Sequence, residues 1–408
     1  MTNESGRHAA DHGAGSTSRR RRLRQRVRTT VPRLSRFAVE HLLLLPLGAL
    51  IALVWVNTAP ESYYRFSFAT SFAVNDVAMM LFFALMTKEV VEATAPGGVL
   101  HPWRRAMLPV VASIGATAVP AFIFVRLVDV LDEPILSFGW PVSLATDLAL
   151  SCFVARLIFW PHPMIPFLLL LGIASDALGF LTLAFFNPMR EVHLASGALI
   201  LAGALGIAAG LRRWRVRSFW PYLLGAGSVS WFGLFRSGLH PALALVPIMP
   251  FLPHAARDPG FFVDALPDAR DTLSQFEIWW RYPAQVALFF FGLVNAGVPL
   301  GALEEGTLGL PIAVIVGKPL GLLVGAGLAL LGGLHLPHRV GWRELIVGGL
   351  IAAMGFSVGL FFCGALLPPG QLRAEMSMGV LLSLAGAPLA IVSARLLRVG
   401  RFRTRPGE

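Results

Sequence analysis

The sequence predicts an all-α membrane protein of about 12 transmembrane helices, each long enough to span a bilayer. Long apolar windows recur from Phe37 to near the C-terminus, and arginines gather in short loops and in both tails. Hydrophobic residues make up 55% of the 408 residues and charged residues only 14%, whereas a soluble domain carries roughly 25% charged residues. We therefore expect the chain to lie in lipid.

The apolar windows define the individual spans, because a helix needs about 17 to 25 apolar residues to cross the hydrocarbon core. The expected spans are 38–57, 72–92, 107–128, 140–159, 163–187, 193–210, 219–235, 239–252, 282–299, 307–331, 341–365 and 376–397. An even number of crossings puts both termini on one side of the membrane.

The arginines indicate which side that is. The loops on the side of the termini carry Arg104, Arg105, Arg212, Arg213, Arg215, Arg217, Arg257, Arg270, Arg339 and Arg343. Cytoplasmic loops carry the excess of positive charge, so both termini of this multi-pass protein are expected in the cytoplasm.

The domain organisation follows from the same pattern. Residues 1–36 are expected to be a disordered basic cytoplasmic tail, 37–398 the transmembrane domain and 399–408 a second basic cytoplasmic tail. The long stretch 253–281 mixes acids, prolines and arginines, and we expect a cytoplasmic connection there.

Three ionisable residues stand near the middle of their spans: Asp147, Asp176 and Lys318. Each costs roughly 2.5 to 3.5 kcal/mol on insertion scales, so each is a functional hypothesis by default. Two acids and one base neutralise each other only in part, which leaves one carboxylate for a proton or a cation. We expect Asp176 and Lys318 to lie within salt-bridge distance at midmembrane, with Asp147 close by. A pair that simply locks two helices is the structural alternative.

Two spans carry signs of interruption. In the fourth, Thr146 and Asp147 compete for backbone hydrogen bonds and favour a helix cap. In the eleventh, the segment around Gly355 offers a second place where a helix can unwind, although glycine in a membrane helix also serves close packing. Two interrupted helices at matching positions of two halves indicate the binding site of a transporter.

The remaining ionisable residues have simpler readings beside functional ones. His240 can sense pH, since an imidazole titrates near neutrality, or can cap a helix. Lys88, Glu89 and Glu92, at the end of the second span, are expected to extend toward the membrane surface. Asp76 is expected to cap the start of that span.

Seven short motifs occur in a characteristic order and spacing. They are Asn75-Asp76 leading to Leu81-Phe82-Phe83 and Glu89, Ala145-Thr146-Asp147, Ser175-Asp176-Ala177-Leu178-Gly179, Ser237-Gly238-Leu239-His240, Asn295-Ala296-Gly297-Val298, Gly317-Lys318-Pro319-Leu320-Gly321 and Gly355-Phe356-Ser357. With them, the stretch from about residue 38 to residue 398 resembles the NhaA-type sodium/proton antiporter family.

The resemblance implies a twelve-helix fold with an inverted-topology repeat, in which spans three to five match spans ten to twelve. It also implies that the fourth and eleventh helices are broken and cross at midmembrane, and that Na⁺ or Li⁺ is exchanged for protons. By position, Asp147 matches the acid at the broken fourth helix, Asp176 the first acid of a fifth-helix pair and Lys318 the tenth-helix lysine. His240 matches a pH-response position, and Glu89 an acid of the cytoplasmic funnel.

One position departs from the family pattern. The second acid of the fifth-helix pair, which the family uses as a direct ion ligand, is Ala177 here. We expect Asp147 and Asp176 to bind the transported cation or proton, Thr146 and Ser175 to add hydroxyl oxygens, and Lys318 to balance the charge.

The expected function is exchange of a monovalent cation for protons, with altered stoichiometry as one option. A non-transporting binding or regulatory subunit is one alternative, and transport of another substrate, such as an anion drawn by Lys318, is a second. No enzymatic motif is present, and we expect no cofactor beyond the transported Na⁺, Li⁺ and H⁺. The expected partners are membrane lipid, small cations and protons, with a homodimer as one option and no nucleic acid.

Overall fold

The computed structural model describes residues 44–94, 107–185, 194–237, 239–254, 271–302 and 305–403, and this part of the chain contains helices and loops without a β-strand. Contacts divide the chain into two units, Met1–Leu44 and Leu45–Glu408, and the site belongs to the second. The tail predicted at 1–36 lies outside the described residues, as does the end of the tail predicted at 399–408.

The chain forms its α-helices in the following order. They are α3 (Leu44–Thr58), α4 (Pro60–Phe72), α5 (Met79–Thr94), α6 (Met107–Leu131), α7 (Leu148–Phe159), α8 (Met164–Phe185), α9 (Leu194–Arg213), α10 (Ser228–Ser237), α11 (Thr272–Asn295), α12 (Gly309–Leu331), α13 (Trp342–Ala352), α14 (Phe356–Leu366), α15 (Gln371–Leu382) and α16 (Gly386–Leu396). Shorter helical pieces include the π-helical turns η1 (Ala73–Ala78) and η4 (Tyr222–Gly227), and the 3₁₀ segments η3 (Pro134–Leu144), η5 (Pro241–Leu243) and η6 (Met249–Phe251).

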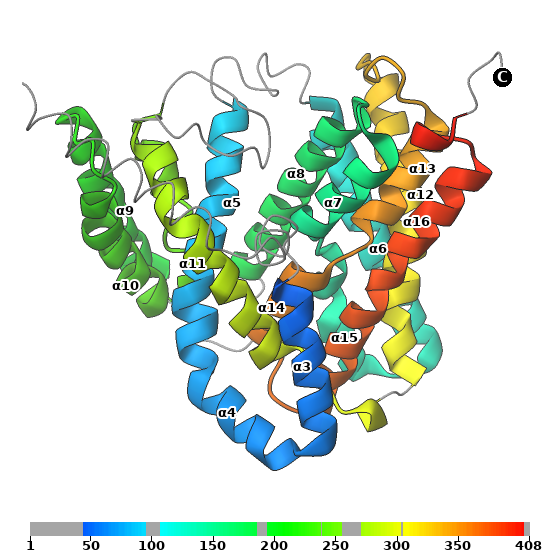
Figure 1. Ribbon diagram of the computed structural model, residues 1–408, viewed down its shortest axis with the longest axis horizontal. Helices are drawn as coiled ribbons and strands as arrows, with labels where there is room; N and C mark the ends of the chain where they lie inside the picture. The colour runs from blue at the N-terminus through cyan, green and yellow to red at the C-terminus, as the bar shows by residue number, and fades with distance from the viewer. Residues whose placement is uncertain are drawn as a thin grey trace, which may run out of the picture. The chain divides into compact units, whose positions relative to one another are not determined.

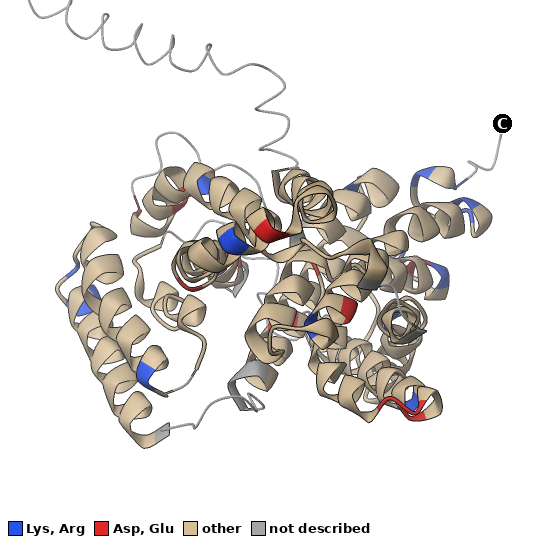
Figure 2. Ribbon diagram, turned by 90° about the horizontal axis from the view of Figure 1, so that it is seen from below, with Lys and Arg blue, Asp and Glu red and all other residues tan. Residues whose placement is uncertain are grey.

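The described helices are suited to a membrane. Six helical stretches are long and apolar enough to cross a bilayer, and the pair α13 and α14, bent by 47°, makes a seventh if it is counted as one span. Long stretches of ribbon carry no charged residue (Figure 2). The prediction of an all-helical membrane protein is therefore confirmed.

Helices α6 and α12 lie side by side along their length, and their contact is the most extensive among the described helices (Figure 1). A side chain at Gly115 would overlap the backbone of Gly321, and one at Gly317 would overlap Pro120. Small residues of this kind let two backbones approach in a membrane. The contact holds α12 rigidly and with it Lys318, one residue after Gly317.

The second span is longer than the sequence predicted. The helix runs from Pro60 to Thr94 through the π-helical turn η1, so Asp76 lies in its middle and does not cap its start. The sequence signal was weak because the first part of this helix, around Ser62 and Arg65, is rich in polar residues.

The predicted eighth span, 239–252, is not an α-helix. It consists of η5 and η6 joined by turns. Pro241, Pro247 and Pro250 interrupt it, because proline lacks the N–H that continues a helix and its ring clashes with the preceding turn. Apolar composition alone was therefore a poor guide to this segment.

The connection predicted at 253–281 is too long. Helix α11 begins at Thr272, where the Asp271 carboxylate accepts a hydrogen bond of 3.1 Å from the Ser274 backbone amide and caps the helix. Aspartate is a favoured N-cap residue, and this signal was present in the sequence. Glu277, expected in the loop, consequently lies in a helix and is buried.

Candidate ion-binding site

Two interrupted helical segments meet at Asp147. Between η3 and α7 the chain is extended over residues 145–147, and a break of three residues separates α13 from α14. The Asp147 backbone amide donates a hydrogen bond of 2.6 Å to the Met354 carbonyl in that second break. The Ser151 hydroxyl donates to the Ile351 carbonyl at 3.1 Å and adds a second link.

The Asp147 carboxylate caps two helices at once. Its Oδ1 accepts a hydrogen bond of 3.0 Å from the Leu150 amide in the first turn of α7. Its Oδ2 accepts one of 2.9 Å from the Ser357 amide in the first turn of α14. Helix N-termini carry partial positive charge, and a carboxylate there is stabilised. The position expected to be an interrupted helix therefore holds a negative charge between two helix ends.

Lys318 occupies the opposite end of the same interruption. Its side chain is fully buried, and Nζ donates hydrogen bonds of 2.8 Å to the Leu144 carbonyl and 2.9 Å to the Thr146 hydroxyl. Leu144 is the last residue of η3, and a cation is stabilised at the C-terminal end of a helical segment. The two ends of the break thus carry complementary charges.

The direct ion pair expected between Asp176 and Lys318 is not formed. Among the described residues Lys318 has no carboxylate within ion-pair distance, because its donors face the carbonyl and hydroxyl of the chain break. Asp176 in α8 is close enough to both Asp147 and Lys318 for their charges to interact. The three charges gather as expected, without direct contact between Asp176 and Lys318.

Two polar atoms of α8 are left without partners. Asp176 Oδ1 and the Ser175 hydroxyl oxygen are both buried and have no hydrogen-bond partner among the described residues. Leaving a polar atom buried and unpaired costs about 1 to 3 kcal/mol, and more for a charged group. Such atoms are typical of a site that completes its contacts by binding something else.

A cavity of about 410 Å³ opens beside Asp176. Its described walls come from α5, α7, α8 and α14 and from Val246, and they consist of Phe82, Phe83, Met86, Thr87, Val90, Leu148, Ile173, Asp176, Ala177, Phe180, Leu181, Val246, Ser357 and Val358. Ala177 is exposed to it. The position where the family pattern has its second acid therefore lies at an open wall and not in a tightly packed core.

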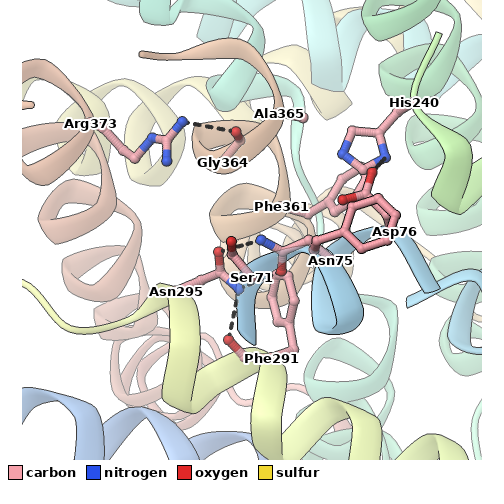
Figure 3. Close-up of a pocket in the computed structure, with 11 residues that line it drawn as sticks. Ser71, Asn75, Asp76, His240, Phe291, Asn295, Phe361, Gly364, Ala365 and Arg373 are labelled. Carbon is pink, nitrogen blue, oxygen red and sulfur yellow. Dashed lines mark hydrogen bonds and ion pairs between the residues drawn. The ribbon is translucent and has the colours of Figure 1, made fainter. Parts of the chain in front are cut away.

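A second cavity, of about 280 Å³, contains His240 and Asp76. In Figure 3 the His240 ring and the Asp76 carboxylate lie against each other, and Nδ1 and Oδ1 are 3.9 Å apart. His240 Nδ1 also accepts a hydrogen bond of 3.3 Å from the Ala242 amide and caps η5. The capping role is confirmed, and pH sensing by His240 stays a prediction.

The other polar walls of this second cavity are held in place by hydrogen bonds. The side chains of Asn75 and Asn295 bond to each other at 3.1 and 2.7 Å. Arg373 donates to the carbonyls of Gly364, at 3.0 Å, and Leu367, at the end of α14. These contacts connect α11 to η1 and α15 to α14.

Aromatic rings from the walls of the two cavities contact each other. Phe83 lines the first and Phe361 the second, and their ring centres are 4.8 Å apart in an edge-to-face contact. Phe180 packs on Phe83 in the same way at 4.9 Å. The sequence reading did not identify this contact, because the two phenylalanines are far apart in the chain and look like ordinary membrane-helix residues.

The sequence reading also missed a cluster of buried charge. Lys88 Nζ forms ion pairs with Glu92 and Glu277, both at 2.7 Å, and with Glu89 at 3.4 Å. Lys88 is 1% exposed, so the expectation that it extends to the membrane surface is wrong. The three glutamates attract it inward, and Glu277 was out of reach of the prediction because its helix had been taken for a loop.

Interrupted membrane helices with buried charge at the break are typical of secondary transporters, and the fold and the site define this class. The model of the family described as Na⁺/H⁺ antiporter 1 matches residues 35–395. The chain belongs to this family.

Relatives match over most of the chain. Na⁺/H⁺ antiporter NhaA 1 of Pelobacter propionicus is 40% identical over 366 residues, covering 87% of this chain and 95% of the relative. NhaA of Geotalea uraniireducens is 40% identical over 361 residues, with 86% and 94% covered. NhaA of Desulfitobacterium hafniense is 39% identical over 379 residues, with 90% and 97% covered.

Proposed function

We propose that the protein exchanges a monovalent cation, Na⁺ or Li⁺, for protons across the bacterial inner membrane, as the names of its relatives state for them. It is a secondary transporter, not an enzyme, and uses no cofactor. The observation that carries the proposal is the buried, unpartnered oxygen of Asp176 at the wall of a cavity, close to the charges of Asp147 and Lys318. A non-transporting subunit is not favoured, because relatives of similar length are named as antiporters.

Asp176 is the group that binds either the cation or the proton. In this proposal Asp147 contributes one negative charge and accepts hydrogen bonds from two helix N-termini, and Lys318 contributes one positive charge and donates hydrogen bonds to Leu144 and Thr146. The site then has a net charge of minus one when Asp176 is ionised and empty. Either one monovalent cation or one proton neutralises it, and each excludes the other because a cation binds only the ionised carboxylate.

This charge balance leads to electroneutral exchange of one cation for one proton. The metal is bound by Asp176, with Ser175 and Thr146 as neutral oxygens and Asp147 as the second negative charge. The Ser175 hydroxyl is suited to this role because it is buried without a partner. Ala177 contributes no further titratable group, so a second proton has no carboxylate on α8 to bind.

Access alternates through the two cavities. The cavity beside Asp176 is open to the site, and the contact of Phe83 with Phe361 separates it from the cavity around Asp76 and His240. Rocking of one helix group against the other around a fixed site would open the site first to one cavity and then to the other. In this proposal His240 and Glu89 adjust the pH range of transport.

The finer fold belongs to the same proposal. We expect twelve crossings with both termini in the cytoplasm, and an inverted repeat whose broken helices cross at midmembrane. The hydrogen bonds that join Asp147 to Met354 and Ser357 support such a crossing, since they link the two breaks directly.

Proton movement in proteoliposomes tests the function. Adding Na⁺ or Li⁺ outside vesicles that contain the wild type should move protons, and Asp176→Asn should abolish this. Asp129→Asn is the matched control, because Asp129 is an exposed carboxylate paired with Arg126 and should transport like the wild type. Absence of cation-dependent proton movement in the wild type would refute the proposal.

A further inference from the structure

The cavity around Asp76 and His240 carries charge of both signs. It measures about 280 Å³, close to the lower end of the roughly 300 to 1,000 Å³ that is typical of small-molecule sites. Among its described lining residues, Arg373 is the one arginine and Asp76 the one carboxylate. The proposed exchange function uses this cavity as a passage and gives Arg373 no role.

Arg373 is fixed in place with part of its guanidinium group left for the cavity. Its Nε donates a hydrogen bond of 2.9 Å to the Leu367 carbonyl, and its Nη2 donates to the carbonyls of Gly364 and Leu367. Among the described residues, Nη1 has no hydrogen-bond partner and no carboxylate lies within ion-pair distance of the side chain. A partly buried charge is costly unless it is paired. The N–H groups of Nη1 are therefore available to an anionic group of a ligand.

The negative charge lies on the other side of the cavity. In Figure 3, Arg373 is on one side, and Asp76 with His240 is on the other. His240 Nδ1 is 3.9 Å from Asp76 Oδ1 and accepts a hydrogen bond from the Ala242 amide. A carboxylate accepts several hydrogen bonds, so Asp76 can accept from an ammonium group in addition to its present contacts.

The lining between the two charged sides is neutral. The side chains of Asn75 and Asn295 bond to each other in both directions, at 3.1 and 2.7 Å. Phe72, Phe291 and Phe361 contribute aromatic rings. Apolar walls favour hydrocarbon, because burying apolar surface contributes roughly 25 cal/mol per Å². The middle of the cavity therefore suits a short hydrocarbon linker.

A single ion fits this arrangement poorly. A metal cation is attracted by Asp76 and repelled by Arg373, and an anion such as chloride is attracted by Arg373 and repelled by Asp76. A molecule with a cationic and an anionic end is attracted by both sides at once. Charge complementarity of this kind provides specificity.

We propose that this cavity binds a small zwitterion, an amino acid whose ammonium group lies on Asp76 and whose carboxylate lies on Nη1 of Arg373. Its hydrocarbon linker lies between α11 and α14, and the ligand connects η1 to α15. The binding does not rest on the proposed exchange function, because neither Asp76 nor Arg373 belongs to the ion site around Asp176.

γ-Aminobutyrate is the probe, and butyrate and butylammonium are its counterparts with one charged end each. In purified full-length protein in detergent near neutral pH, γ-aminobutyrate should raise the temperature of unfolding in a saturable way. Butyrate and butylammonium should bind roughly tenfold more weakly or worse, because each leaves one charged side of the cavity without a partner. Glycine and 5-aminopentanoate, with a shorter and a longer linker, measure the spacing of the two charged sides.

These ligands also define the results that would overturn the proposal. Butyrate that binds as tightly as γ-aminobutyrate would indicate an anion site, and butylammonium that does so would indicate a cation site. Absence of saturable binding by all three zwitterions, glycine, γ-aminobutyrate and 5-aminopentanoate, would overturn the proposal as well.

Variants locate the two ends of the ligand. Arg373→Gln should weaken γ-aminobutyrate binding roughly tenfold or more and leave the weak binding of butylammonium unchanged. Asp76→Asn should weaken γ-aminobutyrate binding to a similar extent and leave that of butyrate unchanged. Arg126→Gln is the matched control, because Arg126 is an exposed arginine paired with Asp129, and it should bind like the wild type.

Asp76→Asn keeps the test decisive, because Arg373→Gln also loses hydrogen bonds to the end of α14 and could fail to fold. Unchanged γ-aminobutyrate binding in Asp76→Asn would overturn the proposal by itself. Binding of γ-aminobutyrate that depends on Asp76, in a wild type without Na⁺-driven proton movement, would refute the exchange function and leave this inference standing.

Discussion

The chain has only two lysines, Lys88 and Lys318, and the structure buries both and surrounds them differently. Lys88 forms ion pairs with three glutamates from α5 and α11. Among the described residues, Lys318 donates hydrogen bonds to two neutral oxygens and forms no ion pair, although Asp176 lies nearby. The first arrangement ties two helices together with fixed charge. The second keeps a carboxylate available, and this availability is what a transport site needs.

Removing the charge of Lys318 should have the largest effect on transport. In Lys318→Met the carboxylates of Asp147 and Asp176 lose their balancing charge, and the Leu144 carbonyl loses its donor. We expect the rate of Na⁺-driven proton movement in proteoliposomes to fall roughly 100-fold or more, as loss of one charge from a buried set costs about 3 to 5 kcal/mol. Lys318→Arg is the charge-preserving control and should keep more activity than Lys318→Met. Near-normal rates in Lys318→Met would show that transport does not depend on the positive charge of Lys318.

Removing the charge of Lys88 should affect stability more than ion binding. Lys88→Met leaves Glu89, Glu92 and Glu277 buried without their cation. We expect the free energy of unfolding to fall by about 3 to 5 kcal/mol, which lowers the temperature of unfolding. The protein that remains folded should keep its half-saturating Na⁺ concentration. Adding Glu92→Gln to Lys88→Met should restore part of the lost stability. If Lys88→Met alters Na⁺ affinity as strongly as Lys318→Met does, the two lysines do not differ as described.

Restoring the acid that is absent at position 177 should strengthen Na⁺ binding in the site near Lys318. Ala177→Asp adds a carboxylate at an open cavity wall, so the side chain has space. We expect roughly tenfold tighter Na⁺ binding, a gain of about 1.4 kcal/mol. Ala177→Asn is the matched uncharged control. Titration of proton movement against Na⁺ concentration measures both, and equal effects of the two substitutions would indicate that charge is not responsible.

Substitution of His240 should have the smallest effect on transport. Its neighbours in the second cavity are Asp76 and Arg373, so a protonated imidazole there is attracted by one and repelled by the other. His240→Ala should move the pH at which transport begins by less than about one unit, because an imidazole titrates near neutrality, without changing the maximal rate. His240→Gln keeps a capping acceptor and separates this role from titration. An unchanged pH profile in both variants would leave only the capping role.

The sequence indicated which charges the structure gathers at the two helix breaks. Asp147 and Lys318 were recognisable because a charge in an apolar span is costly, and Thr146 because it precedes a break in a helix. Their meeting at one point depends on long-range packing, and the resemblance to a known family supplied it. The contact between Asp176 and Lys318 was predicted wrongly, because nothing in the sequence shows that Lys318 would bond to the carbonyl of Leu144 instead.

The parts that sequence reasoning missed have different physical causes. Glu277 was lost because acids and prolines around it resembled a loop, although Asp271 supplied a helix cap. The segment 239–252 was taken for a helix because its apolar content outweighed its prolines. The contact of Phe83 with Phe361 and the cavity at Ala177 arise from packing between distant helices, for which a single sequence gives no local signal.

The central claim is that Asp176 alone changes between a proton and a cation, so that transport moves no net charge. The most direct test measures current from proteoliposomes on a solid-supported membrane after a jump in Na⁺ concentration, together with the transport rate at clamped membrane potentials. Moving one charge against 100 mV would change the driving force by about 2.3 kcal/mol. We predict no steady current and a rate independent of potential for the wild type, and a current for Ala177→Asp. A wild-type current that reverses with the Na⁺ gradient would contradict the account.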